Sequence, residues 1–155
     1  MRILGIDPGT YATGWGIIDC EPGSAKAVAW GAIRAPRSAK FPERLCRMAD
    51  GLKSVIAEHS PKVASLEEAF YGSSVQSALR IGEARGAVIV ACRAAGLEIE
   101  QFSPAQVKKS VTSHGAAHKS QVAEMVRRLL NLDEPPAPED AADALAVALT
   151  LCHRL

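Results

Sequence analysis

The sequence predicts an α/β fold in which a mixed five-stranded sheet is flanked by helices on both faces. Three segments with strand patterns come first, and their short connections favour an antiparallel meander. A helix, a strand, a helix and a strand then follow before a run of helices, and this order fits a mixed sheet. With 155 residues and 48% hydrophobic content, we expect residues 1–155 to form a single domain with a substantial core.

Strand patterns recur five times along the chain. The first is a short apolar run that ends at Asp7, the second alternates, and the third follows the turn signal EPGS. The fourth begins after Pro61 and is expected to end near Glu67, and the fifth alternates again. The predicted strands cover residues 2–7, 13–19, 25–33, 62–70 and 97–102.

Helical spacing of apolar residues accounts for most of the remaining chain. The predicted helices cover residues 42–58, 74–95, a segment after Ser103, 119–131, and a segment that starts near Pro138 and runs almost to the end of the sequence. Ser103 is expected to cap its helix, with Pro104 at the first helical position. Residues 133–138, DEPPAP, cannot lie inside a helix because prolines interrupt them.

The composition is ordinary for a globular protein, with 23% charged residues. No apolar run approaches the ~20 residues that a membrane-spanning helix needs, and Asp7 falls where the apolar part of a signal peptide would begin. We therefore expect a cytoplasmic protein without a membrane partner. Four scattered cysteines without a CxxC pair argue against a zinc site or a disulfide framework.

Charge is unevenly distributed, although the formal net charge is only +1. Residues 104–130 contain five lysines and arginines against one glutamate, whereas residues 131–144 contain five acids and no lysine or arginine. A solvated helix followed by a polar linker would explain these blocks. That is the usual explanation of such blocks, and the alternative is a polyanion-binding face beside a cation-binding site.

Four acids stand in apolar surroundings: Asp7, Glu67, Asp140 and Asp143. The first two end apolar strands, and the last two are three residues apart, so they face the same way on a helix. Simpler explanations exist, because Asp-Pro-Gly suits a tight turn and acids in a first turn favour the helix dipole. Asp143, however, lies in about the second turn among apolar neighbours, where a buried carboxylate is costly unless it is paired or binds a metal.

Four converging carboxylates would repel one another, and two hard divalent cations would relieve that repulsion. Oxygen-only ligands favour Mg²⁺ or Mn²⁺, and the missing Cys/His pattern argues against Zn²⁺. Paired ions of this kind cleave phosphodiesters, because one activates a water and the other stabilises the leaving oxygen. Spacing alone does not require the four acids to meet.

Four segments resemble the RuvC family of Holliday junction resolvases, in the family's order: GIDPGTYATGWGII, SLEEAF, ALRIGEARGA and DAADALAVAL. Together they span nearly the whole chain. The resemblance implies an RNase H-like fold in which the four acids named above are the catalytic, metal-binding residues. Glu67 rather than Glu68 matches the second acid, because the family places it three residues before an aromatic, here Phe70.

The same resemblance implies an activity with its cofactors and partners. It points to a crossover junction endodeoxyribonuclease with two Mg²⁺ ions per site, for which Mn²⁺ would substitute. Such an enzyme cuts a four-way DNA junction symmetrically on two opposed strands, in homologous recombination and DNA repair. It acts as a homodimer and cooperates with a branch-migration helicase complex. Lys108 and Lys119 would contact DNA near the cut phosphate, and Phe70 would stack on an unpaired base.

The predicted helix over residues 74–95 carries a small residue at every fourth position: Ser74, Ala78, Gly82 and Gly86. A glycine inside a helix costs roughly 1 kcal/mol relative to alanine, so the two glycines require a reason. Close approach of another helix would supply it, either in the core or at a subunit interface. The resemblance favours a homodimer interface, which would present two active sites to a twofold substrate.

Other functions remain compatible with the sequence. Within the same fold, an RNase H-like nuclease would act on RNA–DNA hybrids or RNA. A non-catalytic junction-binding module is a further alternative, although four clustered acids would not help a pure binder of a polyanion. An ATP-using actin-like protein rests only on the short match DPGT.

Overall fold

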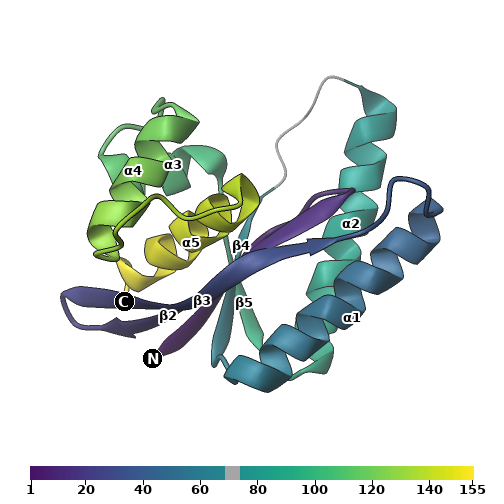
Figure 1. Ribbon diagram of the computed structural model, residues 1–155, viewed down its shortest axis with the longest axis horizontal. Helices are drawn as coiled ribbons and strands as arrows, with labels where there is room; N and C mark the ends of the chain where they lie inside the picture. The colour runs from purple at the N-terminus through teal and green to yellow at the C-terminus, as the bar shows by residue number, and fades with distance from the viewer. Residues whose placement is uncertain (69–73) are drawn as a thin grey trace.

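A five-stranded sheet forms the centre of the computed structural model, which describes residues 1–68 and 74–155. Its strands, in the spatial order β3-β2-β1-β4-β5, are β1 (Arg2–Asp7), β2 (Ala12–Glu21), β3 (Ser24–Arg34), β4 (Val63–Glu67) and β5 (Glu98–Phe102). The first three strands form an antiparallel meander, and β4 runs parallel to both β1 and β5. The predicted mixed sheet is confirmed (Figure 1).

Helices cover both faces of this sheet (Figure 1). In the described part of the chain they are α1 (Phe41–His59), α2 (Val75–Ala94), α3 (Pro104–Thr112), α4 (Lys119–Leu129) and α5 (Glu139–Cys152). The first two lie on one face and the other three on the opposite face. Ser103 caps α3 by accepting a hydrogen bond from the backbone N–H of Gln106, with Pro104 following it, as predicted.

Two hydrophobic cores result, one on each side of the sheet. In β1, Ile3 packs with α3, α4 and α5, whereas Leu4 and Ile6 pack with α1 and α2. Successive residues of a strand point to opposite faces, so the apolar run of β1 contributes to both cores. This explains why the first strand is buried over almost its whole length.

α5 lies directly against the backbone of β1 and β2, because glycines leave room for it. A Cβ atom added to Gly5 would stand 2.0 Å from the carbonyl oxygen of Ala144, and one added to Gly14 would stand 2.0 Å from that of Asp140. Real Cβ atoms do not tolerate such distances. The glycines of the first two strands therefore fix where the first turns of α5 lie, and Gly14 is the register partner of Asp7.

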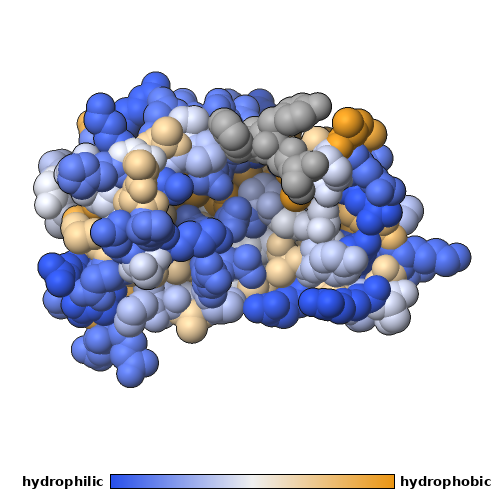
Figure 2. Space-filling view, turned by 90° about the horizontal axis from the view of Figure 1, so that it is seen from above, coloured by the Kyte–Doolittle hydropathy of each residue, from blue (hydrophilic) through white to orange (hydrophobic). Residues whose placement is uncertain are grey.

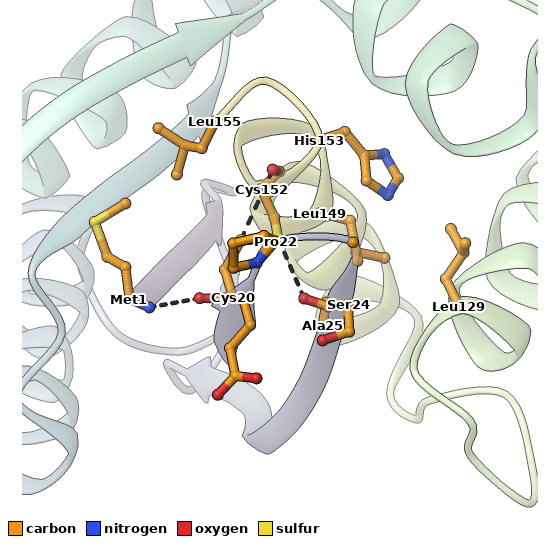
Figure 3. Close-up of a pocket in the computed structure, with 12 residues that line it drawn as sticks. Met1, Cys20, Pro22, Ser24, Ala25, Leu129, Leu149, Cys152, His153 and Leu155 are labelled. Carbon is orange, nitrogen blue, oxygen red and sulfur yellow. Dashed lines mark hydrogen bonds between the residues drawn. A yellow bond between two sulfur atoms is a disulfide. The ribbon is translucent and has the colours of Figure 1, made fainter.

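A disulfide joins Cys20 at the end of β2 to Cys152 at the end of α5, with 5.7 Å between their Cα atoms. The expectation that no disulfide forms was wrong, because it relied on the absence of a local cysteine motif, and this bond spans 132 residues. The bond lies beside a pocket of about 690 Å³, lined by apolar side chains that include Met1, Leu149 and Leu155 (Figure 3). This pocket is at the opposite end of α5 from Asp140 and Asp143.

Within residues 1–68 and 74–155, every helix is too short or too polar to cross a membrane.

Candidate active site

Asp7 and Glu67 lie at the same edge of the sheet. Each is the last residue of its strand, and the two strands are parallel neighbours in which Ile6 pairs with Leu66. Both carboxylates are half-buried. The strand ends predicted from the sequence therefore come together because the carboxyl ends of parallel strands meet at one edge.

Asp140 and Asp143 reach this edge from the first turns of α5. Asp143 lines a pocket of about 210 Å³ together with Asp7 and Glu67. A buried hydrogen bond from Ser65 Oγ to the carbonyl oxygen of Val147, 2.8 Å long, ties β4 to α5. The glycine contacts and this hydrogen bond hold the last helix in register with the strand ends.

The carboxylates influence one another electrostatically. Burial, together with the negative charges of Asp143, Glu67 and Asp140, raises the pKa of Asp7 to about 8. Burial and the charge of Asp143 also raise the pKa of Glu67. Burial raises the pKa of Asp143 even though a lysine bonds to it. The structure thus brings the four predicted acids into one electrostatic group.

Lys119 supplies the positive charge closest to this group. Its Nζ donates to Asp143 Oδ2 at 3.1 Å and lies 3.2 Å from Glu139 Oε1. Partial burial alone would lower the pKa of Lys119, but the contacts with Asp143 and Glu139 raise it above its usual value. Lys108 lines the same pocket, and its charge opposes the rise in the pKa of Glu67.

The donor set consists of carboxylate oxygens, which suits a hard divalent cation. In the described ranges, no three histidine, cysteine, aspartate or glutamate side chains are already arranged around a common ion position. The four acids are therefore close neighbours whose negative charge is partly neutralised by Lys119, but their oxygens do not yet surround one ion position. Carboxylate oxygens that repel one another suit a divalent cation. Such a cation would have to replace the bond between Lys119 and Asp143.

Two of the five lysines and arginines of residues 104–130, Arg127 and Arg128, both bond to Glu124 on α4, so they are occupied in an ion-pair network of their own. Phe70, the aromatic predicted to stack on a base, lies outside the described residues.

Arg85 of α2 is a site residue that the sequence reasoning missed. It donates from Nη1 to the carbonyl oxygen of Glu67 and, at 2.5 Å, from Nη2 to Gln101 Oε1. It also lines a second pocket of about 210 Å³ with Asp7 and Glu67. Burial lowers its pKa, while the charges of Glu68 and Glu67 act in the opposite direction. No local signal distinguishes Arg85, because ALRIGEARGA holds two arginines among small and apolar residues and the partners of Arg85 come from β4 and β5.

Comparison with known proteins relates the whole chain to one group. The family model described as crossover junction endodeoxyribonuclease RuvC matches residues 3–153. A protein of that name from Chloroflexus aurantiacus is 43% identical over 153 residues, covering 99% of this chain and 92% of the relative. Another from Halorhodospira halophila is 49% identical over 152 residues, covering 98% of this chain and 89% of the relative.

Solved structures give the same result. The structure of Thermus thermophilus RuvC has a TM-score of 0.89 at 35% identity, covering 99% of this chain and 94% of that one. The T. thermophilus RuvC structure in complex with a Holliday junction substrate has a TM-score of 0.91 at 35% identity, covering 97% and 92%. The RNase H-like fold that the resemblance implied is confirmed.

Proposed function

The chain belongs to the RuvC family of crossover junction endodeoxyribonucleases, and from this premise we propose that it resolves four-way (Holliday) DNA junctions. It hydrolyses one phosphodiester on each of two opposed strands, in homologous recombination and DNA repair. One observation carries the proposal: carboxylates from β1, β4 and α5 meet at one edge of the sheet, in a pocket that Lys108 and Lys119 also line. A similar structure was solved with a Holliday junction bound.

Asp7, Glu67, Asp140 and Asp143 are the catalytic residues and hold two Mg²⁺ ions, for which Mn²⁺ substitutes. When bound, such a pair of ions activates a water for attack on the phosphorus and stabilises the leaving 3′-oxygen. The protein's own part is to hold the four carboxylates at fixed positions. β1 and β4 fix two of them and the seat of α5 fixes the other two, so the acids do not need to be ordered at the moment of reaction.

Lys108 and Lys119 hold the phosphate that is cut. Both are cations suited to phosphate, and both line the pocket of the carboxylates. Lys119 bonds to Asp143, and its ammonium group would become available to the DNA phosphate if a cation took its place at Asp143. Phe70, three residues after Glu67 in the sequence, stacks on an unpaired base at the junction.

α2 forms the interface of a homodimer. Leu79 is 66% exposed and Val90 is 68% exposed, and a Cβ atom added to Gly82 or Gly86 would meet no atom of the described chain within 4 Å. Close packing inside the chain thus does not explain these two glycines. A twofold dimer places two active sites on a substrate that has twofold symmetry. The dimer of this single-domain chain acts with a branch-migration helicase complex.

A nicking assay tests the proposed function. We expect the purified protein to cut a mobile synthetic four-way junction with Mg²⁺ and not with EDTA, at symmetric positions on two opposed strands. Cleavage mapping on both strands, with an RNA–DNA hybrid duplex of the same sequence as the comparison substrate, distinguishes a junction resolvase from an RNase H-like enzyme. Preferred cleavage of the hybrid would contradict the proposal.

A further inference from the structure

Three arginines and two aromatic rings alternate in what we call the arginine–aromatic cluster: Arg37, Tyr11, Arg44, Phe41 and Arg80. The guanidinium of Arg44 lies 4.0 Å from the centre of the Tyr11 ring and 5.1 Å from that of Phe41. Arg37 lies 5.8 Å from the Tyr11 ring, and Arg80 lies 5.5 Å from the Phe41 ring. A ring attracts a cation over its face within ~6 Å, so the two rings hold three cations close to one another.

The cluster has no matching negative charge in the part of the chain that the structure describes. Most other arginines there pair with a carboxylate, but none of these three lies within 4.0 Å of one, and residues 69–73 contain no acid. Glu43, the acid in the same turn of α1, accepts a hydrogen bond from the backbone N–H of Lys40. Three positive charges this close together repel one another. An anion bound between them would relieve that repulsion, so the cluster should attract one.

Arg44 forms the centre of the cluster and is built into the fold. It is 5% exposed, and its Nη1 donates to the carbonyl oxygen of Thr10 at 3.0 Å. Its Nε finds no hydrogen-bond partner within residues 1–68 and 74–155. Buried charges are normally paired, but the guanidinium of Arg44 has no carboxylate partner within the described residues. Its positive charge therefore adds to that of the two exposed arginines. The cluster is therefore more than a chance grouping of mobile surface side chains.

The cluster lies close to the carboxylates but on the other side of them from the lysines. Tyr11 follows Asp7 by four residues, which span at most ~14 Å, and Arg80 precedes Ile81, which lines a pocket with Asp7 and Glu67. Arg44 and Arg80 belong to α1 and α2, whereas Lys108 and Lys119 belong to α3 and α4 on the opposite face of the sheet. Figure 2 shows hydrophilic side chains on both sides of a central hollow.

We propose that the arginine–aromatic cluster binds the phosphodiester backbone of DNA beside the cut. This inference rests on the proposed function. Arg37 and Arg80, both exposed, make the contacts, because a guanidinium binds phosphate oxygens in a bidentate manner. Phosphates of one strand follow every ~3.4 Å along the helix axis, so this contact falls within a few nucleotides of the cut phosphate. The DNA strand is thus held from both helical layers, by lysines at the cut and by arginines beside it.

The double variant Arg37→Gln/Arg80→Gln tests this inference. Its affinity for the synthetic junction is measured by fluorescence anisotropy in EDTA over a series of salt concentrations. Each lost phosphate contact lowers the slope of log K against log salt by ~0.9, so we expect the slope to fall by between about one and two, with roughly tenfold weaker binding at 0.15 M salt. Arg37→Lys/Arg80→Lys, which keeps both charges, restores most of the slope.

A matched control removes two positive charges from positions of α1 and α2 outside the cluster: Lys53→Gln/Arg93→Gln. We expect wild-type binding and slope from this variant. An equal loss in the control, or a wild-type slope in Arg37→Gln/Arg80→Gln, would overturn the inference. Failure of the wild-type protein to cut the junction with Mg²⁺ would overturn the proposed function instead, so the two failures are distinguishable.

Discussion

α5 and α2 are both rich in small and apolar residues, yet they are used in opposite ways. Ten residues of α5 are buried, and its backbone lies against glycines of β1 and β2. α2 is longer but has four buried residues, and its own glycines face open space within the described chain. The comparison teaches that a small residue indicates close approach but does not say what approaches. For the glycines of the strands the approaching element is α5, and for those of α2 we propose that it is a second copy of the chain.

The difference has consequences for the site. α5 carries Asp140 and Asp143, so its packing on the sheet sets the positions of two of the four carboxylates proposed to be catalytic. α2 contributes Arg85 to the site through one inward-facing position and leaves Leu79 and Val90 exposed. Changes at the α5 contact should therefore affect fold and catalysis together, whereas changes at Leu79 and Val90 of α2 should affect assembly alone.

The largest effect is expected from Asp143→Asn on α5. Loss of one ligand of the catalytic ions removes several kcal/mol of transition-state stabilisation, so single-turnover cleavage of the junction should fall roughly a thousandfold. Glu139→Gln is the matched control, because Glu139 also contacts Lys119 from α5 but is not one of the four proposed ligands. Similar losses in the two variants would contradict the assignment.

Gly5→Ala should disrupt the packing of α5 against β1. The added Cβ would stand 2.0 Å from the Ala144 carbonyl oxygen, and overpacking of this kind costs typically ~1–3 kcal/mol and occasionally more. Gly82→Ala adds the same methyl group to α2, where no atom lies within 4 Å, and should stabilise the monomer fold by ~0.5–1 kcal/mol. Urea unfolding measures the free energy of unfolding of both variants. If both substitutions shift this free energy in the same direction, the expected contrast is contradicted.

Leu79→Lys on α2 should weaken the proposed dimer without destabilising the monomer. Because Leu79 is 66% exposed, the free energy of unfolding of the monomer should change by less than about 0.5 kcal/mol. The dimer should dissociate roughly tenfold more readily, because a charge would be buried at the interface. Sedimentation equilibrium measures the association, and Val28→Lys on β3, another exposed apolar position, is the control. An unchanged dimer would place the interface elsewhere.

The last prediction concerns the pH dependence of stability in EDTA. The pKa of Asp7 is raised to about 8, so the folded state binds a proton more tightly than the unfolded state does. Stability should therefore fall as the pH rises from about 4 to 8, by at most ~1.4 kcal/mol per pH unit for this group. Asp7→Asn should flatten the decline in EDTA, and Glu83→Gln on the exposed side of α2 should not. Thermal unfolding measured from pH 5 to pH 8 checks this expectation, and a steeper or unchanged slope in Asp7→Asn would refute it.

The elements of the fold were predicted well, because each signal depends on residues that are close together in the chain. These signals are the alternation of apolar residues in strands, their helical spacing, the cap at Ser103 and the prolines of residues 133–138. They also placed Asp7 and Glu67 at strand ends. The pairing of Lys119 with Asp143, 24 residues apart, could not be predicted, since it depends on how α4 packs against α5. The same applies to the Cys20–Cys152 bond. It also applies to Arg85 of α2, whose partners Glu67 and Gln101 come from β4 and β5.

The seat of α5 on β1 also controls when the site can exist during synthesis. Asp7 belongs to β1, whereas Asp140 and Asp143 belong to α5, which is synthesised much later than β1. A chain that stops before α5 lacks two of the four carboxylates. Under the proposed function, a translation product that lacks α5 therefore cannot cut DNA.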